Sequence, residues 1–71
     1  MSNEFEFQTT LNGGIVTVVI DTSMPSHMER LVGVFFEDVE ITRFLEKAIL
    51  TGLEMEAESA YSDDIWELSN V

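Results

Sequence analysis

Cysteine is absent from this chain of 71 residues, and cations are scarce, since Arg30, Arg43 and Lys47 stand against fourteen Asp and Glu residues. Without cysteine there is no disulfide and no thiolate nucleophile or ligand, which fits a reducing compartment. The formal net charge is −11. Direct binding to nucleic acid or to an anionic membrane is disfavoured, because both require cations against phosphate. A basic protein partner is compatible with this charge.

No stretch of the sequence approaches the ~20 apolar residues of a transmembrane helix, and the N-terminus lacks the basic start of a signal peptide. We therefore expect a cytoplasmic protein without a membrane partner. The length predicts one domain over residues 1–71 with a small core, because a chain of this size buries only about 60% of its unfolded surface. Hydrophobic residues make up 45% of the chain in a periodic pattern, which argues against a disordered acidic tail.

Residues suited to catalysis are few. His27 is the only histidine, and one histidine among scattered acids does not define a Ser-His-Asp set. Paired carboxylates need a cleft that shifts at least one pKa, for which so short a chain has little room. Asp63, Asp64 and Glu67 offer oxygen ligands, but the EF-hand pattern is absent and helix capping explains them better. Asn12-Gly13-Gly14 is a hairpin turn in acidic surroundings and not a phosphate loop. We predict no catalytic, cofactor or metal site, and a protein that is not an enzyme.

The clearest structural signal is a β-hairpin over Phe5 to Asp21. Apolar and polar residues alternate up to Leu11, and an almost entirely β-branched run follows the Asn12-Gly13 pair. Asn-Gly is the preferred two-residue type I′ turn. This turn predicts that the large apolar groups share one face, in the pairs Leu11–Gly14, Thr9–Val16, Phe7–Val18 and Phe5–Ile20, whereas a three-residue loop would break that pattern. The outer face is a candidate contact surface on which acids stand beside apolar residues: Glu4, Glu6, Asp21, Ile15 and Val19.

The stretch after Pro25 carries two competing signals. Ser26 and Glu29 fit a capping box, and apolar residues follow at helical spacing as far as Val39. The segment Leu31–Phe36, however, is rich in strand formers and contains a glycine, which is costly inside a helix. We predict a helix here, with a third strand near residues 31–37 as the alternative.

A second helix is predicted from about Asp38, which would cap it, to about Ala60. Gly52 allows a kink or an end within it. A short helical turn capped by Ser62 follows. The predicted fold class is α+β, with an N-terminal antiparallel hairpin packed by C-terminal helices in the order β-β-α-α. The helix is expected to meet the hairpin through Phe44, Leu45, Ala48 and Ile49.

The acidic surface is the strongest functional signal. On a helix, Glu54 and Glu58 would sit ~5–6 Å apart, and on a strand Glu54, Glu56 and Glu58 would be spaced by ~6.6–6.8 Å. Either row resembles the charge pattern of a nucleic-acid backbone. We therefore expect a small interaction protein that regulates or inhibits a basic, nucleic-acid-binding protein, by nucleic-acid mimicry in its sharpest form. The expected partner-binding residues are Glu40, Glu54, Glu56, Glu58, Asp63, Asp64, Glu67 and Trp66.

The alternative is a structural or adaptor subunit that acts through an apolar patch rimmed by acids. Its site would combine Tyr61, Trp66 and Leu50 with nearby carboxylates, since aromatic anchors within charged rims are typical of binding hot spots. Self-association through the hairpin face that bears Ile15 and Val19 would make a homodimer. In composition the chain resembles small acidic inhibitors of phages and mobile elements, although no family motif is present.

Overall fold

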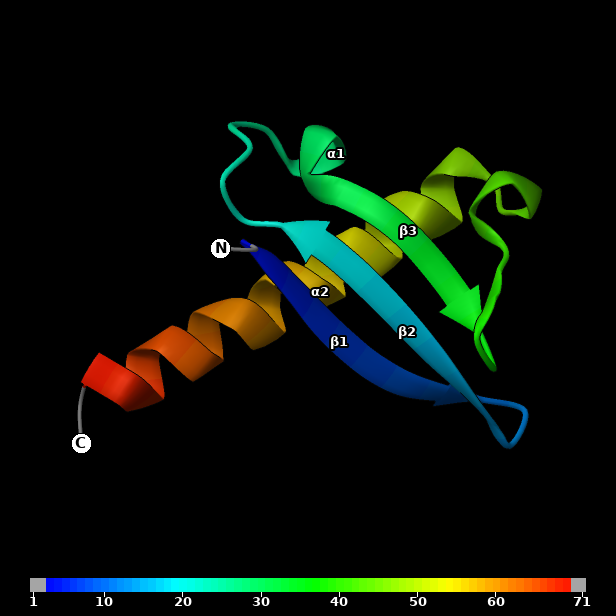
Figure 1. Ribbon diagram of the computed structural model, residues 1–71, viewed down its shortest axis with the longest axis horizontal. Coiled ribbons are helices and arrows are strands. Elements are labelled where there is room, and N and C mark those ends of the chain that lie inside the picture. The colour runs from blue at the N-terminus through cyan, green and yellow to red at the C-terminus, as the bar shows by residue number, and fades with distance from the viewer. Residues whose placement is uncertain (1–2, 70–71) are drawn as a thin grey trace.

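The structure, a computed structural model, describes residues 3–69, with the side chains of His27 and of residues 64–69 excepted. Four strands form one antiparallel sheet in the order β1-β2-β3-β4, and a single long helix crosses one of its faces diagonally (Figure 1). The elements are β1 (Glu4–Leu11), β2 (Gly14–Asp21), α1 (His27–Arg30), β3 (Leu31–Phe36), β4 (Val39–Glu40), the 3-10 turn η1 (Thr42–Phe44) and α2 (Lys47–Ser69). The α+β class is confirmed, but the order β-β-α-α is wrong.

The hairpin has the register that the Asn12-Gly13 turn predicts. Leu11 pairs with Gly14, and the ladder runs without interruption to the pairing of Glu4 with Asp21. Asn12 and Gly13 have φ values of 51° and 82°, as a type I′ turn requires. The local chemistry of two residues therefore determines which face of the hairpin is apolar.

The segment predicted as a first helix is mostly strand. Only α1 is helical, and although Ser26 stands at its N-cap, the Ser26 side chain makes no capping hydrogen bond. β3 pairs antiparallel with β2 through Val18–Val34 and Val19–Gly33, and a bulge follows towards Leu31. The alternative of a third strand near residues 31–37 is thus correct. The strand preference of the β-branched and aromatic residues outweighs their helical spacing here, because β2 provides a hydrogen-bonded apolar neighbour.

Asp38 does not cap a helix, because the chain reverses at Glu37-Asp38 into β4. Both turn residues have positive φ, 48° and 71°, and Phe36 pairs with Val39 across them. The chain then continues along the outer edge of β3, where the Ile41 N–H donates to the Val34 carbonyl oxygen at 2.9 Å.

The long helix starts later than predicted, at Lys47, and runs through Gly52 and Ser62 without a break. Among the described residues, no helix is both long and apolar enough to cross a membrane. The side of the helix that packs on the sheet also differs from the prediction. Only Leu45, among the four expected contact residues, packs against the core. Phe44 is 72% exposed and Ile49 is 48% exposed, and Ala48 is exposed as well.

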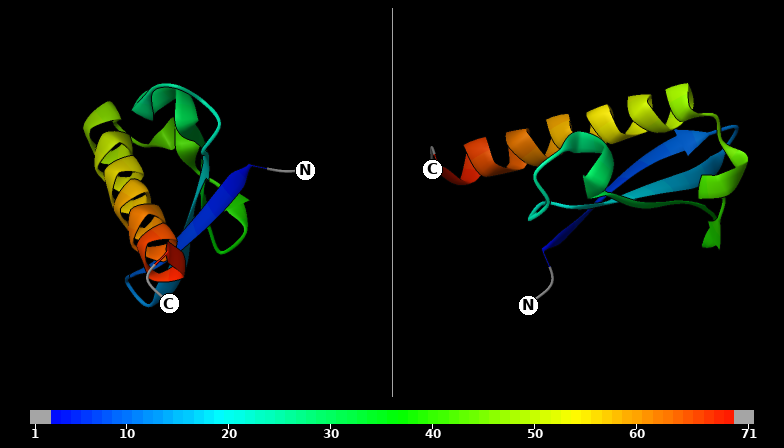
Figure 2. Two further views of the ribbon diagram at one scale, coloured as in Figure 1. Left: turned by 90° about the vertical axis from the view of Figure 1, so that its left-hand side faces the viewer. Right: turned by 90° about the horizontal axis from the view of Figure 1, so that it is seen from above.

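The core lies between α2 and the apolar face of the sheet (Figure 2). Its buried apolar residues are Val16, Val18, Ile20, Val34 and Ala57. Leu50, Leu53 and Tyr61 complete the helix side of the core. At one end the Phe5 and Tyr61 rings meet edge to face, with centroids 5.3 Å apart.

Candidate protein-interaction surface

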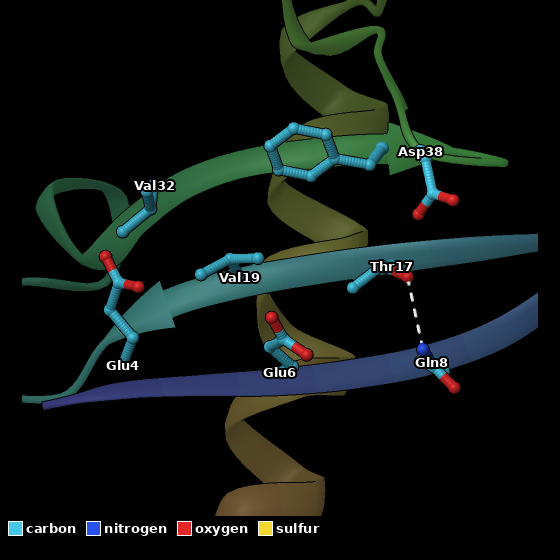
Figure 3. A pocket seen from close by; sticks show the side chains of 8 residues that line it. Glu4, Glu6, Gln8, Thr17, Val19, Val32 and Asp38 are labelled. Carbon is cyan, nitrogen blue, oxygen red and sulfur yellow. Dashed lines mark hydrogen bonds between the residues drawn. The ribbon is translucent and has the colours of Figure 1, made fainter. Parts of the chain in front are cut away.

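The face of the sheet opposite α2 is uncovered by the rest of the described chain, and it is hollowed (Figure 3). The hollow has a volume of about 430 Å³. Because side chains alternate between the two faces of a strand, the outward residues of β1, β2 and β3 gather here. We name this the open sheet face, and it is lined by Glu4, Glu6, Gln8, Thr17, Val19, Val32, Phe35 and Asp38.

The floor of the open sheet face is apolar. Val19 lies on the inner strand β2 and is only 7% exposed, although no helix in the described part of the chain covers it. Figure 3 shows Val19 between Glu6 on one side and Val32 on the other. Phe35 stands on β3 opposite Thr17 and extends the apolar floor along that strand.

The rim of the open sheet face is acidic. Glu4 and Glu6 are two residues apart on β1, which spaces them by ~6.8 Å along the strand, and Asp38 stands at the far end beside β3 (Figure 3). Among the described lining residues none is cationic. Gln8 and Thr17 make one long hydrogen bond of 3.5 Å between their side chains. The surface therefore combines an apolar floor with a negative rim.

The cation that directly precedes β3, Arg30 at the end of α1, is directed elsewhere. Its Nη1 donates to both carboxylate oxygens of Glu58 on α2 at 2.9 Å, and its Nε donates to the Met24 carbonyl at 2.7 Å. The hydrogen bond with Glu58 raises the pKa of Arg30, and the charge of Glu54 acts in the same direction. Arg30 thus fastens the start of β3 to the helix and is not among the residues that line the open sheet face.

The structure does not bring together on one surface the acidic residues that were expected to bind a partner. Glu54 is 0% exposed and Glu58 binds Arg30, so neither forms a row on the outer side of α2. Both residues lie on the side of the helix that carries Leu50 and Ala57, which faces the core. Glu40, Glu56 and Asp63 are exposed, but Glu40 lies on β4 whereas Glu56 and Asp63 lie on α2. The side chains of Asp64, Trp66 and Glu67 lie outside the described part of the chain.

The apolar patch expected around Tyr61 and Leu50 is part of the core, since both residues are partly buried against it. A different apolar groove, of about 310 Å³, opens between the sheet and the first half of α2. Its walls are Thr9, Thr10, Leu11, Val16, Val34, Ile41, Leu45, Ile49, Leu53 and Glu56. Of these, Leu11 and Ile49 are about half exposed, at 54% and 48%.

The sequence pattern of the hairpin identified three residues of the open sheet face: Glu4, Glu6 and Val19. Val32, Phe35 and Asp38 were missed because their segment was assigned to helix, although the strand-forming composition of residues 31–36 was a signal for them. Within the described residues, no group of three or more His, Asp or Glu side chains is placed to hold a metal ion. Comparisons with protein-family models, with curated proteins and with solved structures gave no match.

Proposed function

We propose that this protein is a non-enzymatic interaction module that binds a basic protein partner through the open sheet face and thereby regulates or inhibits it. The observation that carries the proposal is an apolar floor rimmed by Glu4, Glu6 and Asp38 with no described cation among its lining residues. Apolar contact supplies affinity at the centre of such a patch, while the charges at its rim select the partner and steer it.

The backbone at Asp38 supports this assignment. Asp38 occupies a positive-φ turn position, where glycine would be less strained. Strained positions cluster at functional sites, where the strain accompanies a side chain that is needed for function. At Asp38 the side chain in question is a carboxylate at the rim of the open sheet face.

Nucleic-acid mimicry is a narrower form of the same proposal, with Glu4 and Glu6 in place of the inward-facing Glu54 and Glu58. A mimic competes with DNA or RNA for its partner, and its binding weakens steeply with salt. Binding that depends on the apolar floor shows mild salt dependence and is lost when Phe35 is replaced by alanine.

The proposal is tested by capturing the partner from host lysate with two charge-matched triple variants. One variant replaces Glu4, Glu6 and Asp38 by their amides, and the other replaces the exposed acids Glu46, Glu56 and Asp63 in the same way. Both change the net charge by three. We expect the first variant to lose the partner at physiological salt and the second to retain it. The opposite result would place the site on the surface that bears Glu46, Glu56 and Asp63 and refute the open sheet face as the binding surface.

A second candidate function, an adaptor subunit that self-associates, is favoured by the apolar groove beside α2. Leu11 and Ile49 expose apolar surface at its mouth. Sedimentation at increasing concentration tests it: a dimer that Ile49→Ser dissociates would support the adaptor, and a strict monomer would eliminate it.

A further inference from the structure

The two edges of the sheet differ in whether other segments of the chain cover their backbone groups. The outer edge of β3 is closed, because the Val34 N–H donates to the Thr42 hydroxyl oxygen at 2.8 Å and the Val34 carbonyl accepts from the Ile41 N–H. β1 is the other edge strand, and among the described residues its one strand partner is β2. The sheet therefore has one protected edge and one long open edge.

The outward backbone groups of β1 can be assigned from its register. In a two-residue hairpin the pair that flanks the turn, Leu11 and Gly14, exchanges hydrogen bonds, and every second pair along the ladder does the same. The Thr22 N–H donates to the Asn3 carbonyl at 2.9 Å, in phase with this alternation. The backbone N–H and C=O groups that point away from β2 are therefore those of Glu4, Glu6, Gln8 and Thr10. The side chains of Glu4, Glu6 and Gln8 line the open sheet face.

Edge strands are usually protected by proline, lysine, a bulge or short length. β1 has eight residues, an uninterrupted register, and neither proline nor lysine. Its edge charges are those of Glu4 and Glu6. Both repel an acidic strand, including a second copy of this chain with its net charge of −11, and both attract a basic strand.

The helix extends beyond this same edge. α2 has 23 residues, a length of ~34 Å at about 1.5 Å per residue. Its C-terminal part projects past β1 on the core side of the sheet (Figures 1 and 2). A strand placed alongside β1 would therefore have helix backbone on one side and the negative rim on the other.

We propose that the basic partner binds as a fifth, antiparallel strand along β1, with Lys or Arg at alternate positions beside Glu4 and Glu6 and apolar residues on the side of α2. This inference rests on the proposed function and specifies how the partner is held. Main-chain hydrogen bonds to Glu4, Glu6 and Gln8 supply affinity, and the alternating side chains supply specificity.

The test uses an eight-residue peptide of alternating Lys and Val, capped at both ends, titrated into the isotope-labelled protein and followed by the NMR shifts of its amides. In the antiparallel arrangement the Lys N–H groups point at β1 and the Val N–H groups point away. N-methylation of two Lys residues should weaken binding by about tenfold or more through loss of two hydrogen bonds. N-methylation of two Val residues is the matched control and should change affinity little.

A protein variant gives an independent reading. Gln8→Pro removes an outward N–H without removing a backbone hydrogen bond to β2, a substitution that edge strands tolerate. Of the bonds to β2 it loses only the long side-chain hydrogen bond with Thr17. We expect it to keep the fold, judged by its amide spectrum, and to lose the peptide. Equal binding of all three peptides would overturn strand addition while leaving the proposed function in place. Failure of the unmodified peptide to bind would overturn both. A dimer that Gln8→Pro dissociates would assign the edge to a second copy and overturn the proposal.

Discussion

Replacing Asp38 by glycine should make the protein more stable and a poorer binder. Asp38 has φ = 71° in the turn between β3 and β4. A left-handed conformation costs a non-glycine residue about 1–2 kcal/mol, and aspartate less than most because it tolerates this region. We therefore expect Asp38→Gly to gain about 0.5–1 kcal/mol after allowance for the extra entropy of glycine in the unfolded chain. For a domain of this size that is a rise in Tm of about 2–8 °C.

The same substitution removes one carboxylate from the rim of the open sheet face. An exposed ion pair contributes about 0.2–1 kcal/mol, so affinity for the basic protein partner that covers the open sheet face should fall by about 1.5- to 5-fold at low salt. Asp38→Asn separates the two effects, because asparagine keeps the tolerance for positive φ and loses the charge. It should bind as weakly as the glycine variant without the gain in Tm.

Thermal melts followed by circular dichroism measure the stability, and titrations with the captured protein partner measure the affinity. Glu37→Gly is the control for backbone relief, since Glu37 has φ = 48° but also accepts a hydrogen bond from the Ile15 N–H at 3.3 Å. Its gain in Tm should be smaller. A lower Tm for Asp38→Gly would refute the strain argument, and an unchanged affinity for the protein partner would remove Asp38 from the binding surface.

Four further substitutions test the fold. Gly52→Ala should raise stability by about 1 kcal/mol in denaturant titrations, because a Cβ there meets nothing within 4 Å in a continuous helix; destabilisation would mean that the helix ends at Gly52. Val18→Ala, at a fully buried site, should cost about 2–3 kcal/mol, whereas Val39→Ala, 64% exposed, should cost under about 0.5 kcal/mol; equal losses would contradict the placement of the core. Hydrogen bonds from the Ser23 hydroxyl and amide lower the pKa of Asp21 from its ordinary value of 3.8. Their stabilising effect is present above that value and is lost as the pH falls through the lowered pKa. Ser23→Ala should raise the pKa in a carboxyl NMR titration, and an unchanged pKa would rule out the hydroxyl as a contributor.

The half of the open sheet face that belongs to the hairpin could be predicted from the sequence, and the half on β3 could not. Glu4, Glu6 and Val19 follow from alternation and from one tight turn. Phe35 and Asp38 depend on the conformation of residues 31–39, where helical spacing and strand composition compete. Pairing with β2 decides in favour of a strand, because a strand at this position hydrogen-bonds to the backbone groups of β2 and buries Val34 at the centre of the core.

The orientation of α2 is the other feature that local pattern could not supply. Apolar residues occur around the whole helix, and Ile49 and Leu50 favour different faces. The contacts that choose between them come from distant segments: Arg30 binds Glu58, and Phe5 packs on Tyr61. Together they turn Glu54 inward, which removed the acidic row that the sequence had suggested.

The sequence by itself thus determined the hairpin, its register and the acidic edge of β1, because Asn12 and Gly13 impose one turn and one alternation. Tertiary structure alone decided that Leu31–Phe36 is a strand, which face of α2 is buried and which carboxylates remain at the surface. The physical reason is the sequence separation over which each interaction acts. Turn chemistry acts between neighbouring residues, whereas burial and ion pairing depend on segments that meet only when the sheet and the helix have packed together.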